Sequence, residues 1–180
     1  MKDPDLKRIL DFIRPSFRSV AVSAGFCLIL GLIFLIVGGD RGIEAAALVV
    51  LTSAAVLAIP AWMEWSPYFR ALGEFRQLRD DPAMLRAIVE DFDTAPAAFQ
   101  GDVRVGGLYL FGKGSGAMIR REPGCRVVYG KLHYKGGWCW RVAVKTGDSF
   151  TRKLLELDHD KYPEDFITSC VGHANALLEE

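Results

Sequence analysis

The glycine-rich stretch Gly107–Lys113 is the part of this 180-residue chain that comes closest to a nucleotide-binding motif. It fits the first seven positions of the phosphate-binding loop G-x-x-x-x-G-K-[ST]. The eighth residue is Gly114, where a hydroxyl should bind magnesium, and the four residues between the glycines are typical of a strand. No helix is expected to follow and offer its backbone N–H groups to a phosphate. The sequence therefore argues against a nucleotide site, and we expect no cofactor.

Three histidines and four cysteines could support acid–base, nucleophilic or metal chemistry. His159 lies between Asp158 and Asp160, and a carboxylate can orient a histidine as a general base. No serine or cysteine lies in the strand-to-helix elbow that such a base would serve, so a solvated loop is the favoured interpretation. The cysteines lack C-x-x-C spacing, which argues against a zinc site and a disulfide framework. We predict that the protein is not an enzyme and holds no metal, and keep a hydrolase using His159 as the alternative.

Charge is unevenly distributed along a chain whose formal net charge is zero. The region Arg104–Lys153 carries eleven basic and two acidic residues, whereas Leu154–Glu180 carries one basic and seven acidic residues. Either acidic helices neutralise the basic strands, or part of the basic surface contacts anionic headgroups, at roughly 1 kcal/mol per cation. The candidate lipid-facing or partner-facing residues are Arg120, Arg121, Lys131, Lys135 and Arg141. No nucleic acid is expected, because exposed aromatic residues do not alternate with these cations.

Two uncharged apolar runs, Val20–Val37 and Ala45–Met63, lie near the N-terminus. Each approaches the roughly 20 residues that a helix needs to cross a bilayer. Basic residues flank the outer ends of the pair and only Arg41 lies between the runs, which places both termini in the cytoplasm. We predict a two-helix transmembrane hairpin over residues 19–63 and a location in the cell (inner) membrane.

Small residues recur at every fourth position in both runs. They are Ser23, Cys27 and Gly31 in the first run, and Ala54 and Ala58 in the second. Such spacing lets two helix backbones approach closely. The same faces could instead join two copies of the chain, and the oligomeric state stays open.

Helical periodicity continues on both sides of the hairpin. Over residues 1–18, apolar side chains at helical spacing predict an amphipathic helix on the inner leaflet, with packing on the protein's own domain as the alternative. Pro60 is expected to kink or end the second apolar helix. In the predicted helical linker over residues 64–101, Ser66–Pro67 and Asp81–Pro82 indicate two further helix starts.

From residue 102 to residue 180 the pattern changes to short strands separated by tight turns. Within the strand Trp138–Lys145, one face carries Trp138, Trp140, Val142 and Val144, and the other carries Cys139, Arg141, Ala143 and Lys145, so the first face should be buried. Connections this short join antiparallel neighbours, which predicts a meander of about five strands. Pro163 then begins a final amphipathic helix that should cover the sheet.

This region resembles the pleckstrin-homology (PH)-like fold, and the chain resembles bacterial membrane proteins with a two-helix anchor and a cytoplasmic PH-like domain. The resemblance rests on Leu108–Phe111 before a glycine turn, Arg126–Tyr129, Trp138–Lys145 and the helix Phe166–Leu178. The chain shows five strands where the family has seven. The resemblance implies a binding or scaffolding module and transfers no functional residue.

The predicted fold class is therefore a membrane α-helical hairpin plus an α+β soluble domain, with a PH-like antiparallel β meander and a C-terminal helix. The predicted function is a membrane-anchored binding, scaffolding or sensing module. Its expected partners are the lipid bilayer, anionic lipid headgroups or another membrane protein. A membrane-tethered hydrolase and an accessory subunit of a larger membrane complex remain the alternatives.

Overall fold

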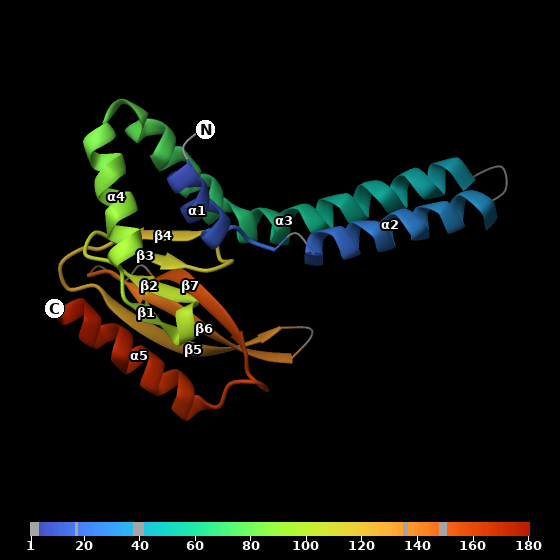
Figure 1. Cartoon of the computed structure of the whole chain (residues 1–180). Helices are drawn as coiled ribbons and strands as arrows, with labels where there is room; N and C mark the ends of the chain where they lie inside the picture. Colours follow the sequence, from blue (N-terminus) through green and yellow to red (C-terminus); the bar gives the residue numbers. More distant parts are fainter. Residues whose placement is uncertain (1–3, 17, 38–41, 135–136, 148–150) are drawn as a thin grey trace. The chain divides into compact units, whose positions relative to one another are not determined.

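The computed structural model describes residues 4–16, 18–37, 42–134, 137–147 and 151–180 (Figure 1). The chain divides into two compact units. Residues 16–66 form the hairpin unit, and residues 1–15 together with 67–180 form the sheet unit.

The hairpin unit contains α2 (Arg18–Val37) and the first part of α3 (Gly42–Gln77). The two helices approach closely at Gly31, where a Cβ atom would lie only 2.6 Å from Cγ2 of Val50. Ala46, one turn before Val50, is buried. The predicted close approach through small residues is therefore confirmed at Gly31, while the side chain of Ser23 lies outside the described residues.

Within the described part of the chain, no helix combines the length and the apolar composition that crossing a bilayer requires. This finding contradicts the predicted transmembrane hairpin, the membrane part of the fold class and the inner-membrane location with cytoplasmic termini. Helices α2 and α3 pack on each other at Gly31 and Val50, although large apolar side chains of both helices, such as Leu28 and Leu51, are exposed.

Helix α3 continues from Gly42 to Gln77, so the predicted end near Pro60 and the predicted start at Ser66–Pro67 are wrong. A proline removes one hydrogen bond, and packing of the flanking residues can sustain the helix past it. The start at Asp81–Pro82 is confirmed, because Pro82 begins α4 (Pro82–Thr94) after the short helix η2 (Leu78–Asp80). The Asp81 side chain accepts a hydrogen bond from the Met84 N–H over 3.0 Å.

Helix α1 (Pro4–Ile13) buries its apolar stripe inside the sheet unit. Leu6, Ile9, Leu10 and Ile13 pack with residues of α3 and α4 and with one face of β3 and β4. We call this cluster the helical core; its other buried members are Ala71, Phe75, Ile88, Phe92, Tyr109, Phe111 and Met118. The prediction of a helix lying on a lipid leaflet is therefore wrong, and its alternative, packing on the protein's own domain, holds.

In the part of the chain that the structure describes, seven antiparallel strands form two sheets. The first contains β1 (Ala97–Ala98), β2 (Val103–Val105), β3 (Tyr109–Gly112) and β4 (Ala117–Arg120), with η3 (Phe99–Gly101) between β1 and β2. The second contains β5 (Arg126–Tyr134), β6 (Gly137–Lys145) and β7 (Thr151–Asp158). The single meander of about five strands is therefore wrong. Strands as short as β1 and β2 leave almost no periodic signal, and the chain changes sheets after β4.

A second cluster, the central core, lies between the two sheets and α5 (Glu164–Glu179). It contains Leu110 and Ile119 of the first sheet and Trp140, Val142 and Val144 of β6. The predicted buried face of that strand is therefore confirmed from Trp140 to Val144. Trp138 of the same face is 50% exposed, and Ala143 of the opposite face is buried beside a register shift between Val142 and Ala143. Because β3 contributes to both cores, all four of its residues are buried. The predicted C-terminal helix is also confirmed, and the Asn175 side-chain amide binds both backbone groups of Val127 on β5.

Candidate functional site

The predicted basic residues do not share one surface. Arg120 is exposed at the end of β4, whereas Arg121 is half-buried and donates a hydrogen bond to the Leu178 carbonyl near the end of α5. Lys131 and Arg141 point to opposite faces of the second sheet, because Lys131 pairs with Trp140, the neighbour of Arg141. Lys135 lies outside the described residues.

Lys131 and Arg141 are also occupied by contacts within the chain. The Lys131 ammonium lies 4.9 Å from the centre of the Trp138 ring and 5.7 Å from that of Trp140. The Arg141 guanidinium forms an ion pair of 2.9 Å with Glu156 on β7. Among the described residues, no ion pair links the seven strands to acidic residues of α4 or α5, so acidic helices do not neutralise the basic strands in this way.

The glycine-rich turn after β3 has a structural role. The N–H groups of Gly114 and Gly116 donate to the carbonyls of Phe12 and Ile13 at the end of α1. The Lys113 ammonium lies 3.1 Å from the Asp102 carboxylate. These donors are therefore engaged by the protein itself, and the turn does not present them to a phosphate.

His159 lies against the face of Trp140, with ring centres 5.0 Å apart. Its Nδ1 atom lies 3.5 Å from Oδ1 of the exposed Asp160. Burial raises the pKa of the Cys139 thiol, and the Glu156 charge adds to the effect. These surroundings favour a packed histidine and a protonated thiol over a catalytic pair. Within the described ranges, no cluster of potential metal ligands is present.

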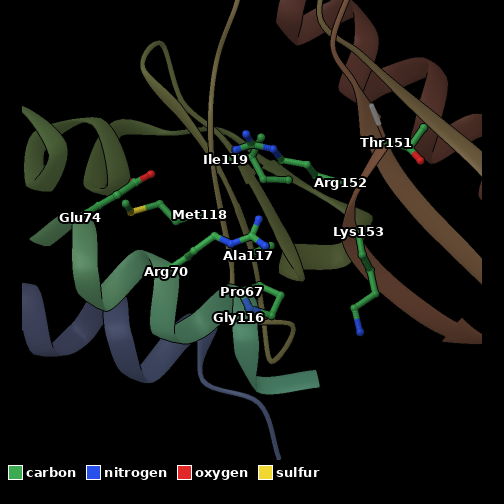
Figure 2. A pocket seen from close by; sticks show the side chains of 10 residues that line it. All are labelled: Pro67, Arg70, Glu74, Gly116, Ala117, Met118, Ile119, Thr151, Arg152 and Lys153. Atoms are coloured by element: carbon green, nitrogen blue, oxygen red, sulfur yellow. The ribbon is translucent and has the colours of Figure 1, made fainter. Parts of the chain in front are cut away.

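A cleft lined by charged residues lies where the last turns of α3 meet β4 and the start of β7. Its volume is about 180 Å³. Figure 2 shows the lining side chains, which are Pro67, Arg70, Glu74, Gly116, Ala117, Met118, Ile119, Thr151, Arg152 and Lys153. Every one of these residues belongs to the sheet unit.

Two close backbone contacts shape this cleft. Strands β4 and β7 are edge strands of the two sheets and lie near each other. At Gly112, a Cβ atom would collide with the Leu154 carbonyl oxygen, so only glycine allows β3 to approach β7 in this way. At Gly116, where φ is +71°, a Cβ atom would lie 2.7 Å from the backbone nitrogen of Tyr68. The two glycines therefore set how closely α3 and β7 approach the first sheet.

Three cations and one carboxylate line the cleft. Figure 2 shows Arg152 reaching from β7 toward Glu74 on α3, with Arg70 one turn away on the same helix. Arg70, Glu74 and Arg152 form no ion pair with any described residue. Lys153 has only a loose contact, 3.8 Å from Glu156. The cleft therefore combines net positive charge with charged groups that have no close ion-pair partner in the described part of the chain.

Glu74 is the charged group of the cleft whose pKa is clearly shifted. Its Oε2 atom is buried and has no hydrogen-bond partner among the described residues. Burial raises the pKa of the Glu74 carboxyl, while the positive charges of Arg152 and Arg120 counteract part of this rise. Burial and the Glu74 charge together raise the pKa of Tyr109 on β3.

The sequence contains only weak signals for this cleft. Arg152 and Lys153 belong to the basic region, but nothing in the pattern links them to Arg70 or Glu74. Glu74 immediately precedes the buried Phe75 and lies three residues after the buried Ala71. A carboxylate at the border of an apolar stripe was the one signal that could have identified it.

Comparison of this chain with known families, curated proteins and solved structures finds no match. The resemblance to PH-like proteins therefore stays a prediction.

Proposed function

We propose that this protein is a binding module whose cleft binds a small anionic group of the phosphate-ester class. The observation that carries the proposal is the set of cations at one cavity, two of them without an ion-pair partner among the described residues. Charged donors left without a partner beside a concave surface are what a charged ligand requires. The proposal thereby moves the anion-contacting cations from the predicted residues Arg120, Arg121, Lys131, Lys135 and Arg141 to the cleft.

The size of the cleft narrows the class of ligand. Sites for drug-sized ligands and cofactors usually enclose roughly 300–1,000 Å³. A cavity of about 180 Å³ suits a phosphate with a few further atoms better than a dinucleotide. Arg70 and Arg152 carry planar guanidinium groups, which can bind two phosphate oxygens at once, and Lys153 adds a point charge.

The hydrolase alternative has less support. His159 is packed on Trp140, and the cleft is lined by neither a histidine nor a cysteine. No observation on the described residues favours the accessory-subunit alternative either. A binding role needs only the cations and the cavity, both of which are present.

The test is calorimetric titration of the full-length protein with inorganic phosphate at low salt. We expect Arg70→Gln and Arg152→Gln each to weaken binding about tenfold, because charge-assisted hydrogen bonds contribute roughly 1.5–3 kcal/mol. The matched control is Arg126→Gln, which removes an exposed arginine of β5 outside the cleft. Equal weakening by the control, or no binding by the wild type, would overturn the proposal.

A phosphate group can come from a dissolved ester or from the headgroup of an anionic lipid. A second arm therefore measures co-sedimentation with phosphatidylserine vesicles against neutral vesicles, using the same variants. Loss of vesicle binding in Arg70→Gln and Arg152→Gln alone would identify a headgroup as the source. Binding of free phosphate without vesicle binding would identify a dissolved ester.

A further inference from the structure

The buried carboxylate oxygen of Glu74 restricts the ligand further. A cleft built only to hold a phosphate would not need a carboxylate, because like charges at short range repel each other. Glu74 nevertheless lines the cavity, and its Oε2 atom is shielded from solvent without a hydrogen-bond donor among the described residues. Leaving a buried acceptor unsatisfied is costly, so the bound state should provide the missing donor.

Among the residues that the structure describes, none provides this donor to Glu74. Arg152 on β7 and Arg120 on β4 are close enough to act on its charge, yet neither forms an ion pair with it. Tyr109 on β3 also senses the Glu74 charge, but no hydrogen bond joins the two side chains among the described residues. The cations are therefore left to bind an anion, while the carboxylate stays available for a different group.

We infer that the ligand of the cleft is a short phosphate ester that also carries a hydrogen-bond donor for Glu74. This donor is a hydroxyl or an ammonium group, and the inference rests on the proposed function. Arg70 and Arg152 would bind the phosphate oxygens, and Oε2 of Glu74 would accept the hydrogen bond. A cavity of about 180 Å³ leaves room only for a short spacer between the donor and the phosphate.

Three phosphate esters of nearly equal size distinguish the contribution of the donor to affinity from that of the phosphate. Propyl phosphate ends in a methyl group, 2-hydroxyethyl phosphate in a hydroxyl, and 2-aminoethyl phosphate in an ammonium group. For the full-length wild-type protein we expect affinity to increase in that order, by about tenfold or more from the methyl to the ammonium group. Equal affinity for all three esters would overturn the inference.

Variants at Glu74 identify the residue responsible. Glu74→Met removes the acceptor and should abolish the preference among the esters, while Glu74→Gln keeps an acceptor oxygen and should retain part of the preference for the hydroxyl. The matched control, Glu90→Gln, changes an exposed carboxylate on α4 and should keep the wild-type order. A preference unchanged in Glu74→Met would assign the donor to another residue and contradict the inference.

The two proposals fail in different ways. If Arg70→Gln and Arg152→Gln weaken binding of all three esters but the esters bind equally, the anion site stands and the role of Glu74 falls. If none of the esters binds to the wild type, the proposed function itself falls. Titration with dissolved esters does not test binding to a lipid surface. Co-sedimentation with vesicles therefore decides whether the phosphate belongs to a lipid headgroup.

Discussion

The cations of the β5–β6 region and those of the cleft have similar side chains but very different surroundings. Lys131 lies over two tryptophan rings and Arg141 is paired with Glu156, so both charges already interact with the chain. Arg70 and Arg152 lie at a cavity without an ion-pair partner among the described residues. The density of basic residues along the sequence suggests the first group as the anion-binding residues. The absence of ion-pair partners among the described residues suggests the second group instead.

This difference shows why a count of basic residues is a weak guide to a binding site. A cation that stacks on an aromatic ring or faces a carboxylate contributes to the fold. A cation beside a hollow and without a partner can contribute to binding. The predictions below test whether the β5–β6 region is structural and the cleft functional.

The largest effect is expected at Trp140, which forms the buried base of the β5–β6 region. Its ring is 4% exposed and its Nε1 donates to the Tyr162 carbonyl over 2.8 Å. Trp140→Ala should lower the free energy of unfolding by about 3–5 kcal/mol, through lost burial and a cavity. Denaturant unfolding of the full-length protein is the measurement.

Trp138→Ala is the matched control, because that ring lies on the same strand and face but is 50% exposed. Trp138→Ala should lower the free energy of unfolding by about 1 kcal/mol or less. Similar costs for the two variants would show that this region does not pack as described.

A smaller effect should separate Arg141 from Arg152. Arg141→Met breaks the pair with Glu156 and should cost up to about 1 kcal/mol of stability with no change in phosphate affinity. Arg152→Met has no ion pair to lose but removes a cation that favours the ionised Glu74, so it should cost some stability near pH 7 and, unlike Arg141→Met, should lower phosphate affinity. Thermal unfolding and calorimetric titration of both variants measure the two effects. The reverse pattern would exchange the roles of the two regions.

The smallest effect concerns the pH dependence of stability at Glu74. Because burial raises the folded-state pKa above the ordinary value of 4.5, the folded protein binds this proton more tightly than the unfolded chain does. The stability that Glu74 contributes is therefore fully present below about pH 4.5 and is lost as the pH rises through the raised pKa.

Glu74→Gln cannot ionise, so this variant should be more stable than the wild type near pH 7, and the difference should shrink toward pH 4. Thermal unfolding across this pH range is the measurement, with Glu90→Gln as the control at an exposed carboxylate. A constant difference between Glu74→Gln and the wild type would contradict the raised pKa.

Local patterns predicted several elements correctly. The apolar stripe of α1, the Asp81–Pro82 start of α4 and the alternation along β6 each depend on neighbours within a few residues. Prediction failed where distant contacts decide the outcome. Helix α3 continues past Pro60 and Pro67, and the strands divide into two sheets after β4.

The candidate site shows the same limit more sharply. Arg70 and Glu74 lie on α3 and Arg152 lies on β7, some eighty residues later in the chain. No spacing rule relates them, because they meet through the close approach of β3 to β7 at Gly112. The predicted residues Arg120, Arg121, Lys131 and Arg141 were chosen from charge alone, and the fold separates them.

The sequence by itself determined the apolar face of α1, the start of α4 and the extended conformation of β6, because these properties depend on periodicity and on short-range capping. It also determined the excess of positive charge between Arg104 and Lys153. Only the tertiary structure decided which cations form no ion pair with a described residue and which carboxylate has a buried oxygen. Burial and ion pairing depend on residues that are distant in the chain, and their proximity is set by how the helices and the two sheets pack.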